Sequence, residues 1–398
     1  MKILIINSVY ETGSTGRIVK CLFNNFNTES DVYLIYGRGK KVSTEHIFKR
    51  TIEIESKLHH LCSLVTGNMY GGMFFSTRRI IRLIRKINPD IVNLHCLNGY
   101  FVNIYTLLNW LAKKNIKTVL TMHADFMMTG GCGYSIECTK YLNANCKHCE
   151  HMKEFNGSLS CNRAFKNFNH LKTVINSFEK SNLKITCVSP WLTNRYKQSP
   201  IYCGYDISTI YNPVDPVFFD KGIKNPYSKK RNVLYVTPDI YDPVKTGWQI
   251  KDIAKLRPDL NFTIVCSKNI NFEFENENIT YIRGGADKYK LRDYYYFADA
   301  TLLLSKRETF SMIVAESLSC GTPVYGFKCG GSESIAINDF SVFVAYGNLN
   351  LLADSLLSIK ANDYLLSEKA LLLYSEKHIS NEYLKLFRNL IDIDGKKL

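Results

Sequence analysis

Short apolar runs alternate with segments of helical periodicity along most of the chain. Runs typical of buried strands occupy Lys2–Ser8, Asp31–Tyr36, Ile91–His95, Lys117–His123, Lys184–Ser189, Val233–Val236, Phe262–Cys266, Ile279–Ile282 and Ala300–Leu304. Helical spacing covers about Thr51–Lys86, Trp248–Leu256, Lys288–Tyr296, Thr309–Ser319 and a segment that begins near Ile18. Strands that alternate with helices are typical of parallel α/β sheets, so two such series predict two doubly wound domains.

The most specific pattern lies in residues 302–333, LLLSKRETFSMIVAESLSCGTPVYGFKCGGSE. A buried strand ends in a polar turn that carries Glu308, and the helix that follows carries Glu316. Ligands of open α/β sheets bind outside the carboxyl ends of the strands, so we expect both carboxylates to face one cleft. The alternative for an isolated pair is a capping Glu and a solvated helix Glu.

These residues resemble the donor-binding signature of the retaining GT-B glycosyltransferases of family 4. The positions that agree with the signature are Ser305, Glu308, Phe310, Glu316, Gly321, Pro323, Val324, Gly330 and Gly331. Thr309 and Ser311 replace two glycines of the family pattern. The resemblance implies that Glu308 contacts the donor sugar and Glu316 the ribose, and that Phe310, Ser311, Gly330 and Gly331 belong to the donor site.

Lys245 lies where the family has the Lys of a Lys-Gly pair that binds the donor diphosphate. The Arg that usually accompanies this Lys is missing, because Ile240 and Val244 occupy its places. Arg307 and Arg283 are the candidate replacements. A leaving diphosphate needs positive charge and helix N-termini around it, which gives the Lys its expected role.

The first half of the chain opens with a strand, the segment Glu11-Thr-Gly-Ser-Thr-Gly-Arg17 and a helix. Gly13 and Gly16 permit close approach of a phosphate to backbone N–H groups, and Arg17 adds a cation, so the segment is a candidate part of the donor site. It matches neither the dinucleotide-binding fingerprint nor a Walker loop. A plain tight turn is the alternative.

Two strand runs of the first half end in a histidine, His95 and His123. The text that follows the second, HADFMMTGGCGY, resembles a subgroup of family 4 found in colanic-acid, O-antigen and exopolysaccharide biosynthesis. This resemblance implies that His123 faces the donor sugar from the first domain and is catalytic with Glu308. His95 and Asp125 are candidates for the acceptor side, although Ala124 stands where the subgroup has its Asp.

Four cysteines, Cys132, Cys138, Cys146 and Cys149, lie within 18 residues of each other. Four thiolates can close a tetrahedral zinc site, but this spacing is not that of a standard finger or ribbon. The alternatives left open are a structural zinc ion and reduced thiols in a loop. A catalytic metal is not expected, because all candidate ligands lie in one insertion.

Composition describes a soluble globular protein of 398 residues, with 45% hydrophobic and 22% charged residues and a net charge of +15. No apolar run reaches the roughly 20 residues of a membrane-spanning helix, and the start, MKILIINSVY, has no small-residue cleavage site, so cytoplasmic residence is expected. The basic segment Arg78–Lys86 with its bulky neighbours predicts either peripheral binding at the inner face of the cytoplasmic membrane or a core helix with a solvated basic face.

Together these observations predict an α/β protein of the GT-B type, with two Rossmann-like domains that face a central cleft. Residues 1–212 form the acceptor-side domain, with a Cys-rich insertion at about 130–162, residues 213–375 bind the nucleotide-sugar, and a helix in 376–398 packs back on the first domain. The predicted activity is that of a retaining hexosyltransferase that moves a sugar from a UDP- or GDP-sugar to a glycan or lipid-linked acceptor in surface polysaccharide biosynthesis.

Three alternatives remain. A nucleotide-sugar epimerase or hydrolase of the same fold would release free sugar, and a non-catalytic glycan binder would not turn over a donor. A nucleic-acid-binding protein is disfavoured, because the basic residues are dispersed and no standard nucleic-acid motif is present.

Overall fold

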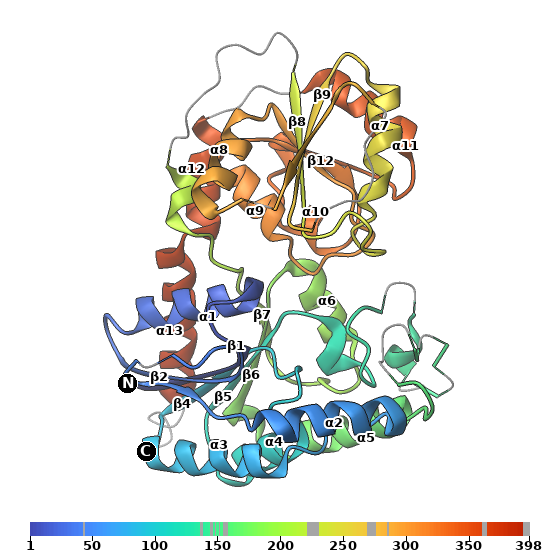
Figure 1. The fold of residues 1–398 in the computed structure, drawn as a ribbon. Coiled ribbons are helices and arrows are strands. Elements are labelled where there is room, and N and C mark those ends of the chain that lie inside the picture. The colour runs from blue at the N-terminus through green and yellow to red at the C-terminus, as the bar shows by residue number, and fades with distance from the viewer. Residues whose placement is uncertain are drawn as a thin grey trace. The chain divides into compact units, whose positions relative to one another are not determined.

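The protein, seen in a computed structural model, folds into two compact units (Figure 1). The structure describes residues 1–42, 44–135, 138–143, 146–147, 149–150, 152–153, 158–220, 231–268, 276–284, 286–359 and 364–392. The first unit comprises Met1–Ile210 and the chain from Ser380 onward, and the second comprises Tyr211–Ile379. Parts of the predicted Cys-rich insertion and of the predicted C-terminal segment lie outside the described residues, as do residues 221–230.

The first unit is a seven-stranded parallel sheet in the order β3-β2-β1-β4-β5-β6-β7. Its elements are β1 Lys2–Val9, α1 Gly13–Phe26, β2 Asp31–Arg38, β3 Ile47–Lys49, α2 Glu53–Thr66, α3 Phe74–Ile87, β4 Ile91–Leu94, α4 Ile104–Lys113, β5 Thr118–Met122, α5 Ala164–Ile175, β6 Leu183–Cys187, α6 Pro190–Gln198, β7 Ile207–Thr209 and α13 Glu376–Asp392, which enters this unit at Ser380. Helices α1 and α13 cover one face of the sheet, and α3, α4 and α5 cover the other (Figure 1). Strands covered on both faces are mostly apolar, which explains the nearly continuous apolar runs in the sequence.

The second unit has a six-stranded parallel sheet in the order β10-β9-β8-β11-β12-β13. Its elements are β8 Asn232–Thr237, α7 Ile250–Leu256, β9 Asn261–Cys266, β10 Ile279–Arg283, α8 Lys288–Phe297, β11 Ala300–Leu303, α9 Met312–Ser319, β12 Val324–Phe327, α10 Gly331–Ile335, β13 Ser341–Val344, α11 Leu349–Ser355 and α12 Tyr364–Tyr374. Helices α7 and α11 lie on one side of this sheet, and α8, α9 and α12 on the other (Figure 1). The predicted pair of Rossmann-like α/β domains is therefore confirmed.

Each sheet has one point at which the strand order reverses direction. This point lies between β1 and β4 in the first unit and between β8 and β11 in the second. At such a switch point the connections on the two sides lead to opposite faces of the sheet, which leaves a crevice at the carboxyl ends of the strands. The loops that follow β1, β4, β8 and β11 are therefore where the fold favours ligand binding.

Two helix predictions need correction. The Gly-Ser-Thr-Gly-Arg segment is not a loop before the helix, because α1 already begins at Gly13, after Thr12 as its N-cap. The predicted helical region 51–86 is two helices, α2 and α3. The break between them follows from backbone conformation, since Gly67 (φ +67°) ends α2 in the left-handed region and Met73 (φ +56°) precedes α3.

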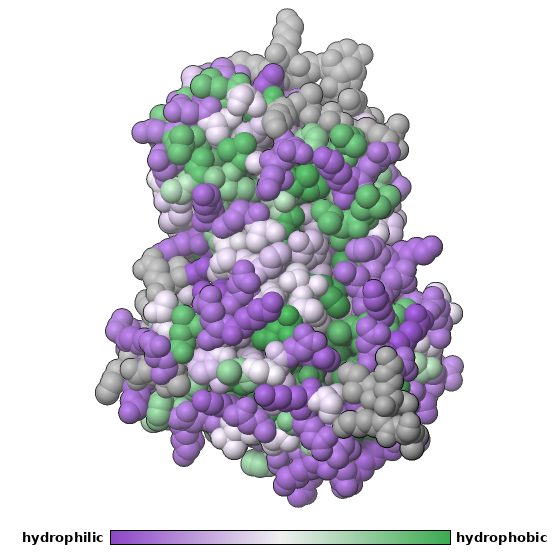
Figure 2. Space-filling model, turned by 180° about the vertical axis from the view of Figure 1, so that it is seen from behind, coloured by the Kyte–Doolittle hydropathy of each residue, from purple (hydrophilic) through white to green (hydrophobic). Residues whose placement is uncertain are grey.

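The face of the molecule seen in Figure 2 is covered mainly by hydrophilic residues, with smaller groups of hydrophobic ones between them. Among the residues that the structure describes, no helix is long and apolar enough to cross a membrane.

The final helix should contribute strongly to the stability of the first unit. The Phe387 ring of α13 packs edge-on against Phe26 of α1 at 5.5 Å between centroids, and both side chains are fully buried. We expect Phe387→Ala to lower the free energy of unfolding of this unit by about 3–5 kcal/mol, because it leaves a cavity. The measurement is the urea midpoint from Trp110 and Trp191 fluorescence in a Trp248→Phe background.

The matched control is Phe75→Ala, whose side chain is 65% exposed and whose loss should change stability by no more than about 0.5 kcal/mol. Equal midpoints for the two variants would contradict the role given to α13.

Candidate functional site

An ion pair joins the two loops at the switch point of the second unit. The ammonium of Lys245, from the loop after β8, lies 2.5 Å from Oε1 of Glu308, in the loop after β11. The same carboxylate oxygen accepts a hydrogen bond from the Ser305 hydroxyl at 2.8 Å. The Lys245 side chain is 25% exposed and that of Glu308 is 12% exposed, so the pair is shielded but can be reached by a ligand. Sequence analysis predicted both residues for the donor site, and the structure brings them together.

The loop that carries Lys245 is fixed by its own polar contacts and by contacts with its neighbour. Asp242 accepts hydrogen bonds from the backbone N–H groups of Val244 and Lys245. Thr246 donates its hydroxyl hydrogen to the carbonyl of Leu304 at 2.6 Å, and the N–H of Lys306 donates to the carbonyl of Val244 at 2.7 Å. The backbone that carries Lys245 is therefore fixed before any ligand binds, which reduces the ordering cost of binding.

The Gly-Gly turn packs directly on the backbone beside Glu308. The Glu308 N–H donates to the carbonyl of Cys329, and the Gly331 N–H donates to the carbonyl of Glu308 at 2.8 Å. A Cβ on Gly331 would lie 2.2 Å from the backbone of Thr309, so only glycine fits there. The Glu333 carboxylate accepts from the N–H groups of Cys329 and Gly330 and caps α10.

Glu316 and Phe310 have partners of their own. The Glu316 side chain is buried in α9 and accepts a hydrogen bond from the hydroxyl of Tyr295, on α8, at 3.2 Å. Phe310 is buried, with ring contacts to Tyr211 and Tyr374. Glu316 and Glu308 therefore have separate hydrogen-bond partners.

The helix α9 begins three residues later than predicted. Ser311 is its N-cap, with φ +76°, and its hydroxyl accepts a hydrogen bond from the N–H of Val314. A left-handed residue cannot continue a helix, so the turn after Glu308 extends to Ser311.

In the first unit, His95 and His123 follow the last residues of β4 and β5, as predicted, and lie in contact. Nδ1 of His95 is 3.0 Å from Nε2 of His123, and Nε2 of His95 is 3.0 Å from the Asn93 amide nitrogen. Since the amide nitrogen can only donate, Nε2 of His95 accepts and its Nδ1 carries the proton that it donates to His123.

A chain of hydrogen bonds through the sheet fixes this arrangement. The Thr121 hydroxyl donates to the carbonyl oxygen of the Asn93 side chain and accepts from the hydroxyl of Thr186, on β6, and from that of Tyr383, on α13. Burial raises the pKa of Tyr383 to about 12, so its hydroxyl stays protonated. These contacts decide which way the Asn93 amide points and, through it, the tautomer of His95.

Both histidines are kept neutral. Burial lowers the pKa of His123 to about 4. Burial, and then the nearby His123, lower the pKa of His95 well below its usual value. A neutral imidazole can both donate and accept a hydrogen bond at neutral pH, as contacts with sugar hydroxyls require.

The predicted phosphate segment of the first unit lies at the start of α1. Gly16 is buried, and a Cβ there would lie 3.2 Å from the Val9 side chain and from the Glu11 N–H, which accounts for the glycine. Gly13, with φ +67°, and Arg17 are exposed. The segment follows β1, on one side of the switch point, and the Asn7 side chain at the end of β1 accepts from the Cys96 N–H beyond β4.

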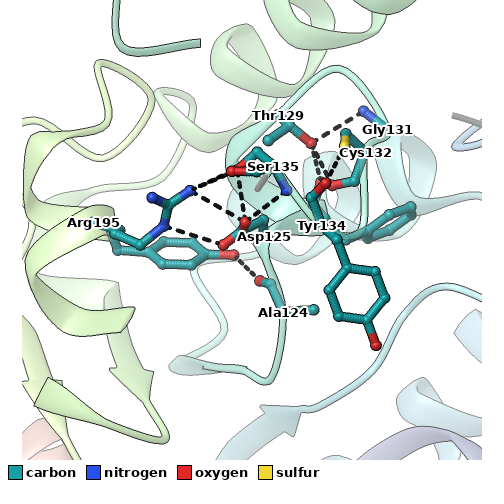
Figure 3. A network of polar contacts seen from close by, with 10 residues as sticks. Ala124, Asp125, Thr129, Gly131, Cys132, Tyr134, Ser135 and Arg195 are labelled. Atoms are coloured by element: carbon teal, nitrogen blue, oxygen red, sulfur yellow. Dashed lines mark hydrogen bonds and ion pairs between the residues drawn. The ribbon is translucent and has the colours of Figure 1, made fainter. Parts of the chain in front are cut away.

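Asp125 has a different environment from the histidines, shown in Figure 3. Its side chain is 1% exposed, lies 3.2 Å from the Arg195 guanidinium of α6 and accepts from the N–H and hydroxyl of Ser135. The guanidinium also lies over the Trp191 ring, 4.7 Å from its centroid. Through this network, Asp125 holds the segment that carries Cys132 and Ser135 against α6.

The four cysteines predicted for zinc line one cavity of about 280 Å³, together with Lys140 and Glu150. Within the described part of the chain, however, no three His, Cys, Asp or Glu side chains are grouped so that they could hold a metal ion. Thiolates are suitable ligands for zinc, but the described side chains are not placed as a set of zinc ligands. The structural zinc site therefore stays a prediction.

Sequence reasoning missed several residues that position the site. Asn93 and Thr121 gave a usable signal, since each is a polar residue inside an otherwise apolar strand run. Arg195 and Tyr295 gave none, because their importance comes from partners far away in the sequence.

The neutral histidines predict a pH dependence of stability. Below about pH 6.5, histidine in the unfolded chain gains a proton that folded His123 does not bind, so the unfolded state is favoured as pH falls towards about 4. We expect the urea midpoint to fall between pH 6.5 and 4.5, and to fall less in His123→Gln. The exposed His60 gives the control variant His60→Gln, which should keep the wild-type slope. The same slope in all three proteins would contradict a neutral His123 in the folded state.

The ion pair of Asp125 predicts a large stability effect. We expect Arg195→Ala to cost about 3–5 kcal/mol, because it leaves a buried carboxylate without its cation. The control Arg388→Ala removes an exposed pair with Glu29 and should cost less than about 1 kcal/mol. Both are measured as urea midpoints, and a small effect of Arg195→Ala would show that Asp125 is not anchored by this pair.

Comparison with known proteins extends this description. Residues 250–371 match the family model of glycosyl transferases group 1. The match includes Glu308 and Glu316 and begins just after Lys245. The chain is 20% identical over 389 residues to the putative colanic acid biosynthesis glycosyl transferase WcaC of Escherichia coli K12, covering 89% of this chain and 91% of the relative.

Solved structures match the chain over nearly its whole length. Sucrose-phosphate synthase from Thermosynechococcus elongatus matches with a TM-score of 0.67 at 13% identity, over 98% of this chain and 99% of the other. Anabaena Alr3699/HepE in complex with UDP-glucose matches with a TM-score of 0.61 at 12% identity, over 98% and 100%. Residues 250–371, most of the second unit, therefore match the glycosyl transferases of group 1, and the fold is that of the GT-B structures.

Proposed function

We propose that this glycosyltransferase moves a sugar from a nucleoside-diphosphate donor to a glycan or lipid-linked acceptor with retention at the anomeric carbon. The observation that carries the proposal is the Lys245–Glu308 ion pair across the switch point of the second unit. A cation and an anion held together suit a donor whose diphosphate is negative and whose sugar becomes positive as the bond to the phosphate breaks.

Lys245 is assigned to the diphosphate. As the bond between the anomeric carbon and the phosphate oxygen breaks, its electron pair goes to the diphosphate, and the ammonium stabilises that charge. The N-terminus of α9, which begins at Met312 just after Glu308, adds a positive helix dipole. Arg283 is a poor substitute for the missing Arg, because it ends β10, three strands away from β11 in the sheet.

Glu308 is assigned to the sugar. Its carboxylate can stabilise positive charge at the anomeric carbon and bind sugar hydroxyls through strong charge-assisted hydrogen bonds. The new bond forms between the anomeric carbon and the acceptor oxygen on the face that the phosphate leaves, and the acceptor proton passes to the departing phosphate oxygen. Glu316 is proposed for the ribose, and His95 and His123 for hydroxyls of the sugar or acceptor.

The donor and the pathway are proposed from the relatives. The UDP-glucose complex of the Anabaena protein supports a UDP-sugar, and a GDP-sugar remains the other candidate. The Escherichia coli relative supports assembly of a surface polysaccharide, in which the acceptor is a glycan on a lipid at the inner face of the cytoplasmic membrane.

The test is turnover of a panel of UDP-, GDP- and dTDP-sugars by purified protein with and without a glycan acceptor. We expect Glu308→Gln to lower kcat by about 10²–10³-fold with the fold intact, because the variant keeps the shape but loses the charge. Lys245→Ala should mainly lower kcat/KM for the donor.

Matched controls are Glu368→Gln and Lys255→Ala, exposed residues of α12 and α7, which should leave turnover unchanged. Wild-type rates in Glu308→Gln and Lys245→Ala would refute the assigned roles. Release of free sugar with no product on any acceptor would favour the epimerase or hydrolase alternative.

A further inference from the structure

Helix α2 exposes its hydrophobic side to solvent. Four apolar residues recur along it at intervals of four, three and four, which places them on one side of the helix. They are Ile54, Leu58, Leu61 and Val65, and each is more than half exposed. The opposite side, packed on the unit, carries the small or polar residues Ser56, His59 and Ser63. This is the reverse of the usual amphipathic arrangement, in which the apolar stripe faces the core.

The apolar surface continues onto the start of α3. Phe74 and Phe75 are 67% and 65% exposed. The Glu55 carboxylate of α2 accepts hydrogen bonds from the N–H groups of Phe75 and Ser76 at 2.8 and 2.9 Å, which ties the first turns of the two helices together. The first turn that carries Ile54 therefore lies next to the one that carries the two phenylalanines, and we call these six residues the apolar stripe. Both helices lie in the outer layer of the first unit (Figure 1).

A group of cations adjoins the stripe. The solvent face of α3 carries Arg78, Arg79, Arg82, Arg85 and Lys86, all exposed. Three of them, with Lys49, Arg50 and Leu83, line a cavity of about 300 Å³, here called the basic cavity. Lys49 is paired with Glu53 at 2.6 Å, but no acidic side chain is among the residues that line the cavity. Like charges gathered this closely repel each other unless an anion lies between them.

We infer that the apolar stripe and the basic cavity form a docking surface for a bilayer that contains anionic phospholipid. The stripe would enter the boundary between headgroups and acyl chains, and the cavity would take a lipid phosphate. Surfaces that combine bulky apolar side chains with Lys and Arg bind in this manner, with affinity that depends on both terms.

Other occupants fit the surface less well. A second copy of the chain, related by a two-fold axis, would bring the α3 cations of both copies near each other. Nucleic acid would account for the cations but not for six exposed apolar side chains. The bilayer uses both features. The inference names a partner that suits the proposed lipid-linked acceptor, yet it rests on this surface alone and does not require the proposed reaction.

The test is binding of the full-length protein to phosphatidylcholine vesicles with and without phosphatidylglycerol, measured by co-flotation at physiological ionic strength. We expect binding only when phosphatidylglycerol is present. Leu58→Ser with Leu61→Ser should weaken it about tenfold or more, because two apolar side chains that would enter the bilayer are lost. Arg79→Ala with Arg82→Ala should weaken it about tenfold or more and reduce its salt dependence.

The control variants carry the same substitutions on the second unit. Leu371→Ser with Leu372→Ser changes exposed leucines of α12, and Lys251→Ala with Lys255→Ala changes exposed cations of α7. Both should bind as the wild type does. Absence of binding to anionic vesicles, or equal losses in the control variants, would overturn the inference.

Two further readouts separate the remaining outcomes. Light scattering that shows a wild-type dimer, dissociated by the Leu58 and Leu61 changes, would assign the surface to a second copy and overturn the bilayer. Transfer to a soluble acceptor, measured without vesicles, should be unchanged in the leucine variant. Vesicle binding without donor turnover would leave the docking surface standing and count against the proposed function alone.

Discussion

The ion pair between Lys245 and Glu308 depends on a property of the parallel sheet. Because β8 and β11 are neighbours at the point where the strand order reverses, the loops that follow them meet at one edge of the sheet. Each loop is held to the other through its backbone, and the glycine turn at Gly331 locks the second loop in place. Opposite charges can therefore sit 2.5 Å apart in a partly shielded position without a large ordering cost at the moment a ligand binds.

In the first unit, loops also meet at the switch point of a parallel sheet, but most of the buried polar groups near it are uncharged. Its switch point lies between β1 and β4, where the glycines of α1 and the buried His95 lie, and the partly buried His123 follows the next strand, β5. The polar chain from Tyr383 through Thr121 and Asn93 to His95 satisfies hydrogen-bonding groups inside a sheet that is otherwise apolar, where an unmatched polar group would cost about 1–3 kcal/mol. These hydrogen bonds allow the buried imidazole of His95 and the partly buried one of His123 to stay neutral with fixed tautomers.

The strands and the residues at their ends could be predicted from local sequence patterns. Residues whose role comes from partners far away in the sequence could not. Buried runs predicted the inner strands of both sheets but not the edge strands β3, β7 and β13, and the strand ends placed Glu308, His95 and His123 correctly at the carboxyl edge. The position of Ser311 shows the limit. A pattern with Ser in place of Gly does not reveal whether the backbone keeps a left-handed turn, and here it does, with a hydrogen bond from Val314 that offsets part of the roughly 1–2 kcal/mol cost. Arg195 was invisible because its partner lies 70 residues away.

Helix α2 shows a different limit, since the period of an amphipathic helix is the same whichever side is buried. Its inner side is small and polar because the chain comes close there: the His59 ring nitrogen is 2.9 Å from the carbonyl of Asn68, and a Cβ on Gly72 would lie 2.5 Å from that ring. A leucine in place of His59 would lose the hydrogen bond to the Asn68 carbonyl, so this position on the inner side favours a polar residue. The leucines on the outer side are not forced there by the fold, and polar residues would serve a solvated helix better. Binding to an anionic bilayer, as inferred above, would explain why these apolar residues are exposed beside the α3 cations.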